Sequence, residues 1–520
     1  MKKYICAFIL LISYSFLSLG YEVKFGPTEQ AGKRGKTLII GEFNGNIYVY
    51  KYKSLPLGVE KHYIHKYNAN SLETIEQKEI DIKAKNFEGI YLINDKLVIF
   101  EREKDIKNNL QKLFYHIYNP NTLSIEKSSI KIAEFEFERK LFSSKGGFNV
   151  VPSENRTKFA VYYDLPYNKG EAEKFGVAVF SGDFDVILDA SVTLPSPDEL
   201  MSLGNPYLSN DGRFYISATE VSEKRLFRLP SEIKHHIFEV SEGGKLNDYL
   251  IDLQEKYIYD YTYETNPEGN LVCSGFYGEP KRDGVAGGFF LRINKVSRAI
   301  EEASFKDFPL EFITAGWSDR SKKKAKKRKD KGKGNPTLYS YDIRNVVALD
   351  DGGAILTAEQ YYVRVVTYRD ANGNTRTTYY YYYNDIIVMK LNNSGKFDWY
   401  AKIPKFQVST NDGGYYSSYS FHVGKEKLYF MFNDNIKNFE KGDVVGGKTY
   451  AANLGNQKNV TSLVEMNISD GKMNKKKLFS KSELKTIAVP KVYHSDRQLN
   501  TLYIFSKKKR KERLGLIRFQ

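Results

Sequence analysis

The sequence predicts an all-β protein, and its composition, short apolar runs and lack of helical periodicity support this prediction. Aromatic residues make up 14% of the 520 residues, with 40 tyrosines against 15 prolines and 6 methionines, a usage typical of strands. The apolar runs are short and bounded by Gly, Asn or Asp, as strands between turns are. No long window shows the 3.6-residue apolar period of an amphipathic helix.

One strand pattern recurs eight times along the chain. Examples are NIYVYKY at 46–52, KLVIFER at 96–102 and KLYFMFN at 427–433. A second strand follows each copy, and most units then carry a polar turn and a third run. Each unit is therefore expected to form a four-stranded antiparallel sheet of about 50 residues.

Such sheets cannot bury both of their faces alone, so radial stacking into a β-propeller is the predicted architecture. We expect eight blades, with seven as the alternative, in one domain over 21–520. The last unit ends after its third strand, and YEVKFGP at 21–27 is expected to supply the missing outer strand and close the ring.

The first 20 residues have the pattern of a secretory signal peptide. Two lysines precede an apolar run, and the small residues Ser18 and Gly20 stand at its end. The protein is therefore expected to be exported, to the periplasm, the outer membrane or the extracellular space. Cys273 is the only cysteine after this segment, so we expect a buried thiol and no intrachain disulfide.

The repeat period and strand pattern resemble those of uncharacterised secreted β-propeller proteins of Gram-negative bacterial envelopes. The resemblance covers nearly all of 21–520 and implies no activity. The signatures of WD and kelch repeats are absent, and SNDGRFY at 209–215 matches the aspartate box of sialidases only in part.

Residues 361–383 are predicted to form a projecting hairpin, in which YYVRVVTYRD and TRTTYYYYY flank ANGN. Asn372-Gly373 suits a tight turn. Because strand side chains alternate, Tyr379, Tyr381 and Tyr383 should lie on one face, with the intervening tyrosines on the other. Two interpretations stay open: the tyrosines hold up the ribbon by cross-strand pairing, or they form a binding surface.

Other unusual segments are expected on the same face of the ring. The loop at 406–420 should lie beside the hairpin, and the connection at 434–460 is long. Basic loops at 319–334 and 507–513 carry net charges of +8 and +5. They are either solvated loops or an attractive surface for anionic partners.

The chain contains no motif that specifies catalysis. His62, His116, His235 and His236 lie in third strands of different blades and should not converge on a metal, so we expect neither a metal nor a cofactor. The candidate ligand-binding residues are Glu359, Tyr361, Arg364, Arg376, Tyr379, Tyr381, Tyr383, Asn411, Asp412, Tyr415 and Tyr416.

These observations favour a non-catalytic binding or scaffold propeller that is monomeric outside larger assemblies and does not span the membrane. Its expected partner is an envelope protein complex or an anionic glycan, not a nucleic acid. The alternative is a polysaccharide lyase or another glycan-active propeller enzyme. In a lyase, a Tyr or His removes a proton beside a uronate carboxylate that a cation neutralises, and Arg364, Arg369, Arg376 and Glu359 would be the first residues to test.

Overall fold

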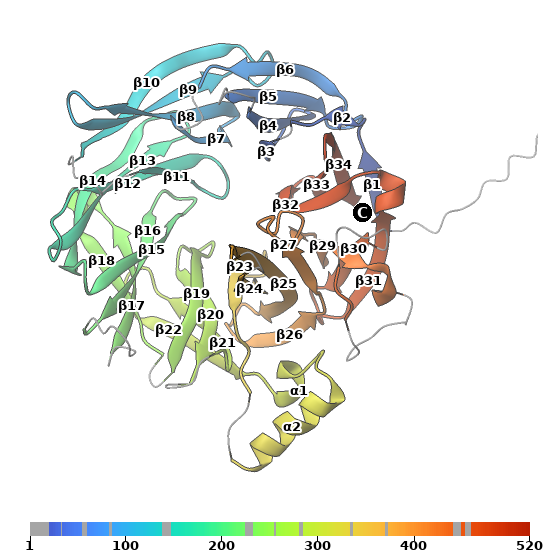
Figure 1. The fold of residues 1–520 in the computed structure, drawn as a ribbon. Coiled ribbons are helices and arrows are strands. Elements are labelled where there is room, and N and C mark those ends of the chain that lie inside the picture. Colours follow the sequence, from blue (N-terminus) through green and yellow to red (C-terminus); the bar gives the residue numbers. More distant parts are fainter. Residues whose placement is uncertain are drawn as a thin grey trace, which may run out of the picture.

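Eight sheets, each built on four antiparallel strands, surround a central axis in the computed structural model (Figure 1). The structure describes residues 20–32, 34–54, 60–82, 86–137, 147–223, 232–253, 256–279, 284–332, 336–369, 373–439, 449–452 and 459–520. The predicted eight-bladed β-propeller is confirmed, and the seven-bladed alternative is wrong. Of the segment interpreted as a signal peptide, only Gly20 falls within the described residues.

Blades one to four follow chain order, each beginning with its innermost strand (Figure 1). Blade one contains β3 (Arg34–Phe43), β4 (Asn46–Ser54), β5 (Glu60–Asn68) and β6 (Thr74–Ile80). Blade two contains β7 (Phe87–Ile93), β8 (Lys96–Asp105), β9 (Leu110–Tyr118) and β10 (Ile125–Glu136). Blade three contains β11 (Phe148–Pro152), β12 (Lys158–Leu165), β13 (Ala172–Ser181) and β14 (Val186–Pro197). Blade four contains β15 (Met201–Leu208), β16 (Phe214–Val221), β17 (Ile233–Val240) and β18 (Leu246–Ile251).

Blades five to seven continue this order, and the sixth has an extra strand. Blade five contains β19 (Tyr257–Thr265), β20 (Leu271–Gly278), β21 (Gly287–Ile293) and β22 (Ile300–Asp307). Blade six contains β23 (Tyr341–Ala348), β24 (Ala354–Arg369), β25 (Thr375–Leu391) and β26 (Phe397–Ile403), with β27 (Gln407–Thr410) beside β25. Blade seven contains β28 (Ser420–Val423), β29 (Lys427–Asn435), β30 (Asn459–Asn467) and β31 (Met473–Ser480).

The N-terminal and C-terminal segments close the ring together in blade eight. β32 (Ile487–Asp496), β33 (Thr501–Lys508) and β34 (Lys511–Phe519) come from the end of the chain. The outermost strand is β1 (Tyr21–Phe25), which pairs with β34 from Tyr21↔Phe519 to Phe25↔Gly515, while β2 (Glu29–Gln30) extends this pairing. The predicted closure by the N-terminal strand is confirmed.

Alternating side chains of the middle strands fill the spaces between blades. In β16, Phe214 belongs to an apolar cluster shared by blades three and four, whereas Tyr215 belongs to the next cluster, shared by blades four and five. Cys273 lies in that second cluster with no exposed surface. Burial raises the pKa of its thiol, and the prediction of a buried cysteine is confirmed.

Three α-helices lie outside the sheets in the part of the chain that the structure describes: α1 (Leu310–Ile313), α2 (Asp319–Asp330) and α3 (Lys481–Leu484). The structure corrects the basic loop predicted at 319–334, because most of that segment is helix α2. Ser318 caps its first turn by accepting from the Ser321 N–H, and basic residues in its last turn suit the negative end of the helix dipole. Within the described ranges, no helix is long and apolar enough to cross a bilayer.

Strand β1 should contribute to stability through Phe25. Its ring packs edge-on against Phe479, with centroids 5.1 Å apart, and covers Gly515. We expect Phe25→Ala to lower the free energy of unfolding by about 2 to 4 kcal/mol, measured by urea denaturation. Lys24→Ala, on the exposed face of the same strand, is the matched control with an expected change below about 0.5 kcal/mol. Equal losses in both variants would contradict this role of β1.

Candidate functional site

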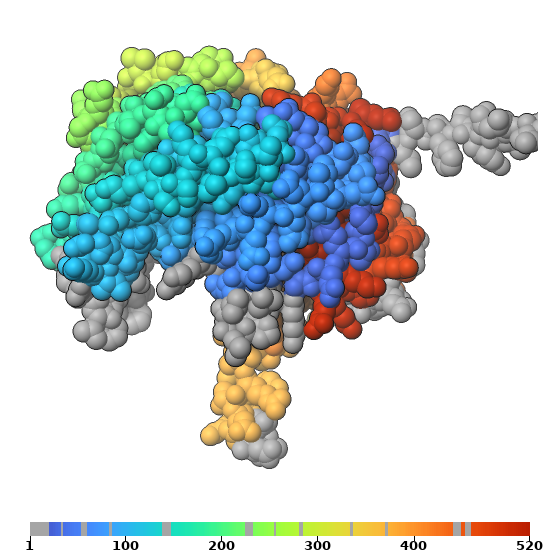
Figure 2. Space-filling view, turned by 90° about the horizontal axis from the view of Figure 1, so that it is seen from above, coloured from blue at the N-terminus to red at the C-terminus, as the bar shows by residue number. Residues whose placement is uncertain are grey.

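A two-stranded ribbon projects from blade six on one face of the ring. β24 and β25 pair as far as Arg369↔Thr375, whereas the flanking strands end at Tyr341↔Gln360 and Ile386↔Ile403. Residues 361–369 and 373–383 therefore extend beyond the blade and form the yellow-orange projection in Figure 2. The predicted hairpin is confirmed. Asn372 lies outside the described residues, and Gly373 has the positive φ of 82° that a tight turn uses.

The loop that enters blade seven reinforces the ribbon, as its predicted position beside the hairpin suggests. β27 pairs with β25 from Tyr383↔Gln407 to Tyr380↔Thr410. Beyond it, Asn411 holds Tyr379 by two hydrogen bonds, one to the Tyr379 carbonyl at 3.0 Å and one from the Tyr379 N–H at 2.9 Å. The outer edge of β25 is thus covered up to Tyr379.

The ribbon has two chemically different faces. One face carries the cross-strand pairs Tyr361–Tyr383, Val363–Tyr381 and Val365–Tyr379. The other face carries the pairs Tyr362–Tyr382, Arg364–Tyr380 and Tyr368–Arg376. The predicted alternation of the tyrosines is therefore confirmed. One face is apolar and aromatic, and the other carries tyrosines with two arginines.

The packing of the side chains differs between the base and the outer part of the ribbon. At the base, Tyr361 and Tyr383 have ring centroids 4.7 Å apart, and Tyr362 and Tyr382 stack at 4.6 Å. Such cross-strand pairs stabilise the ribbon. Further out, Val365 is 53% exposed, and the exposed apolar residues of this part are Val363, Val365, Tyr368 and Tyr379. Only the outer part therefore offers an unpacked surface.

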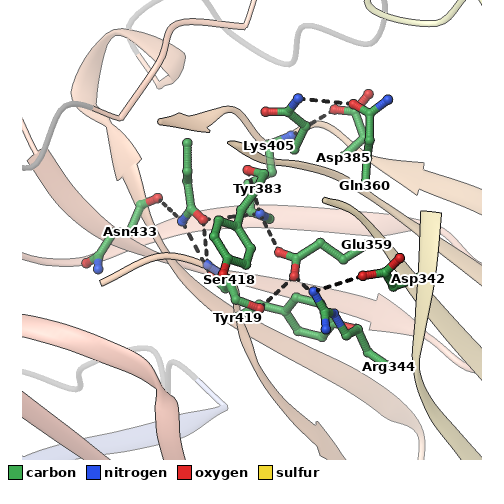
Figure 3. A network of polar contacts seen from close by, with 12 residues as sticks. Asp342, Arg344, Glu359, Gln360, Tyr383, Asp385, Lys405, Ser418, Tyr419 and Asn433 are labelled. Atoms are coloured by element: carbon green, nitrogen blue, oxygen red, sulfur yellow. Dashed lines mark hydrogen bonds and ion pairs between the residues drawn. The ribbon is translucent and has the colours of Figure 1, made fainter. Parts of the chain in front are cut away.

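A buried ion pair lies at the base of the ribbon, between β24 and the segment that joins β26 to β27 (Figure 3). The Lys405 Nζ lies 2.7 Å from Glu359 Oε1, and neither side chain is exposed to solvent. The other carboxylate oxygen accepts a hydrogen bond from Ser418 Oγ at 2.7 Å and lies 3.3 Å from Arg344 Nε. Lys405 also donates to the Tyr383 carbonyl at 2.9 Å.

This enclosure corrects the role predicted for Glu359. Its carboxylate has no exposed surface with which to meet a ligand, and Lys405, Ser418 and Arg344 already surround it. Burial lowers the pKa of Lys405 despite the adjacent Glu359. Glu359 therefore positions the ribbon.

Lys491 of β32 is an exposed residue at the base of the ribbon that sequence reasoning missed. Its Nζ donates to the Tyr383 hydroxyl at 2.7 Å and lies 4.3 Å from the ring centroid. Arg344 lies over Tyr361 in a similar way, at 5.6 Å. No sequence signal separates these cations from the other 77 lysines and arginines of the chain, because their contacts with the two tyrosines arise only in the folded protein.

The other candidate residues of the loop at 406–420 are Asp412, Tyr415 and Tyr416, and they shape or pack this loop. The Asp412 carboxylate accepts from Ser409 Oγ and from the Gly414 N–H, and so shapes the turn. Tyr415 and Tyr416 are half-buried against the apolar cluster of blades one and eight, with perpendicular rings 4.9 Å apart. Burial raises the pKa of both phenols. The structure thus gives these two tyrosines a packing position instead of a place on the ribbon.

The two basic segments differ in their placement. Helix α2 stands at the outer rim beside α1, beyond β22 and β26 (Figure 1), where Lys402 Nζ donates to the Phe312 carbonyl at 2.8 Å. Its lysines and arginines are mainly exposed. The run at 507–513 forms the hairpin between β33 and β34, and its Lys507 is buried.

The histidines predicted in third strands lie in third strands. His62, His116 and His236 are buried in third strands of different blades. No group of three or more His, Cys, Asp or Glu that could hold a metal ion occurs in the parts of the chain that the structure describes. His422, near the axis, has hydrogen-bond contacts with Ser495 and Asn500.

Glu264, on the innermost strand of blade five, is an acidic residue with a strongly raised pKa. Burial, aided by Glu154, raises the pKa of Glu264 to about 8, against the opposing effect of Arg497. Glu264 belongs to blade five, Glu154 to blade three and Arg497 to blade eight. Residues of such widely separated blades can act on one carboxyl only close to the axis, so the Glu264 carboxyl lies there. Its Oε1 is buried and has no hydrogen-bond partner among the described residues.

Comparison with known proteins identifies similar folds only. No family model and no curated protein sequence matches the chain. The WD40 domain of SCAP from fission yeast is 9% identical, with a TM-score of 0.41, over 96% of this chain and 95% of that one. The β-propeller domain of the Trilobed protease from Pyrococcus furiosus is 11% identical, with a TM-score of 0.35, over 86% and 96% of the two chains. The polysaccharide lyase Uly1 is 9% identical, with a TM-score of 0.36, over 84% and 91%.

Breaking the buried ion pair should destabilise the protein strongly. Glu359→Gln leaves Lys405 buried without a countercharge, and we expect a loss of about 3 to 5 kcal/mol in the free energy of unfolding, measured by urea denaturation. Glu359→Leu combined with Lys405→Met removes both charges and should recover at least half of this loss. Glu79→Gln, which breaks an exposed pair with Lys61 at 2.8 Å, is the control and should change stability far less, because solvent screens exposed pairs. A Glu359→Gln variant as stable as the control would refute the anchoring role.

Glu264 should make stability depend on pH. Between its ordinary pKa of 4.5 and the folded-state value of about 8, the folded protein binds a proton that the unfolded chain lacks. Stability should therefore fall as the pH rises through this window. Glu264→Gln should remove that part of the fall, measured as urea midpoints from about pH 5 to about pH 9. The same pH profile in both proteins would show that Glu264 is not responsible.

Proposed function

We propose that this protein is a non-catalytic binding or scaffold propeller of the bacterial envelope, which holds a partner through the outer part of its blade-six ribbon. The observation that carries the proposal is the ribbon itself. It extends beyond its blade and exposes Val363, Val365, Tyr368 and Tyr379. Large apolar side chains gathered on a protruding element mark interaction sites more often than they serve the fold.

The construction of the ribbon supports this function physically. Its base is held by the Glu359–Lys405 pair and by β27, which pairs with β25, so its strands are held in place before a partner arrives. A preorganised surface loses less conformational entropy on binding than a flexible loop. Tyrosine and arginine also contribute large contact areas, which is why they are enriched where binding energy concentrates.

The charge of the molecule favours an anionic partner. Residues 361–369 and 373–383 carry three arginines and no acidic residue, and α2 adds eight basic residues against two acidic ones. Such a distribution accelerates encounter with acidic surfaces, and the effect weakens with added salt. An envelope protein complex or an anionic envelope polymer has the required charge, and the signal-peptide pattern of residues 1–20 underlies the proposed location.

Two features count against the lyase alternative. A tyrosine that removes a proton near neutral pH needs a lowered pKa, whereas burial, together with Tyr361 and Glu359, raises the pKa of Tyr383. Glu359 is enclosed by its own ion network. We therefore assign the cations at the base of the ribbon to positioning.

The proposal is tested by comparing recovery of partners from native cell envelopes after crosslinking, with mass spectrometry for proteins and sugar analysis for glycans. We expect the triple variant Val363→Ser, Val365→Ser, Tyr379→Ser to lose at least about 90% of a specific partner, since hot-spot contacts dominate binding. The control Val186→Ser, Ile187→Ser, Val296→Ser removes exposed apolar groups far from the ribbon and should keep full recovery. Undiminished recovery by the ribbon variant would overturn the proposed function.

A further inference from the structure

The inner edge of β24 is open along the ribbon. β23 pairs with β24 only as far as Tyr341↔Gln360, and the Tyr361 N–H donates to the Ser340 carbonyl at 2.7 Å. Before Ser340 the chain turns to blade five, where Leu338 bridges Val285. Among the described residues, no strand other than β25 pairs with β24 from 362 to 369. This edge faces the ring axis, because β23 is the innermost strand of the blade.

The hydrogen-bonding groups on this edge can be assigned from the ladder. In an antiparallel pair, every second residue directs its N–H and C=O away from the partner strand. Tyr379, opposite Val365, bonds outward to Asn411 through both of its backbone groups, so this pair is a non-hydrogen-bonded one. The backbone groups of Val363, Val365 and Thr367 therefore point to the open edge.

Natural proteins protect such edges, because an exposed row of donors and acceptors recruits another strand. The opposite edge of the ribbon follows this rule, since β27 and Asn411 cover β25 up to Tyr379. The β24 edge contains no proline and no bulge from 361 to 369. Its open length is eight residues, or about 27 Å of strand.

The side chains beside this edge define what an added strand would carry. Val363 and Val365 face one side and Arg364 faces the other. Neighbouring residues on paired strands interact directly, so apolar residues suit the first side and acidic residues the second. A second copy of this chain is a poor match, because pairing two such edges places Arg364 and Arg369 of both copies beside one ladder without a single acidic residue from 361 to 369.

We propose that the open edge of β24 binds an extended segment of a partner protein as an additional antiparallel strand, and that this segment alternates apolar and acidic residues. The inference rests on the proposed binding function of the ribbon and specifies its mode. Main-chain hydrogen bonds from Val363, Val365 and Thr367 supply affinity, and the two ribbon faces supply sequence preference.

The test uses the full-length protein and three capped eight-residue peptides. One alternates valine and glutamate, one alternates valine and lysine, and one repeats the first with N-methyl groups on the amides that would face β24. The key variant is Val365→Pro, which removes one outward N–H without touching the β24–β25 ladder, since proline is tolerated at such edge positions. Val365→Thr, which keeps the N–H, is the matched control. Binding is measured by fluorescence anisotropy and calorimetry.

We expect saturable binding of the valine–glutamate peptide, at least tenfold weaker binding of the lysine and N-methyl peptides, and at least tenfold weaker binding by Val365→Pro than by Val365→Thr. No saturable binding of the first peptide, or equal binding by the two variants, overturns the strand-addition mode. If the protein forms a dimer in sedimentation experiments and Val365→Pro makes it monomeric, the partner-protein strand is wrong and a second copy of this chain occupies the edge.

The envelope pull-down separates this outcome from failure of the proposed function. If the triple ribbon variant loses its partner while Val365→Pro retains it, the ribbon binds through its faces and strand addition is wrong. If neither variant loses a partner, both proposals fail together.

Discussion

A four-stranded sheet with apolar residues on both faces needs a neighbour on each side, and this constraint organises the whole chain. In β16, successive residues Phe214 and Tyr215 fill the spaces toward blades three and five, so each blade is stable only between two others. Every blade has a neighbour on both sides only if the ring closes, and the pairing of β1 with β34 closes it. Connections then gather at the two ends of the ring, and the long ones are free to extend from a rigid support.

The ribbon is packed tightly at its base and is exposed in its outer part. At its base, Tyr361 and Tyr383 pair, and the buried Glu359–Lys405 contact joins β24 to the segment between β26 and β27. A buried ion pair contributes little net stability, but it defines one arrangement of the groups around it, which suits an element that must stand in a fixed direction. Above this base, apolar side chains and backbone groups are left open to solvent.

The fold was predictable from the sequence because strand signals repeat. The eight strand pairs, the ring closure and the hairpin at 361–383 all follow from local pattern and period, and they agree with the structure. Helix α2 was missed, since a lysine-rich segment between strands has the composition of a solvated loop while its Ser318 cap and dipole-compatible ends favour a helix. The roles of Glu359 and Lys491 depend on contacts between blades, and one sequence carries no record of which lysine meets which tyrosine.

Hydrogen exchange of the full-length protein, with and without solubilised native envelope, tests the central claim most directly. The account predicts that bound partner slows exchange of the amides of Val363, Val365 and Thr367, which face the open edge, while the amides of the turns on the opposite end of the ring keep their rates. Slowed exchange confined to those opposite turns, or to the innermost strand of blade five around Glu264, would contradict the assignment of binding to the ribbon.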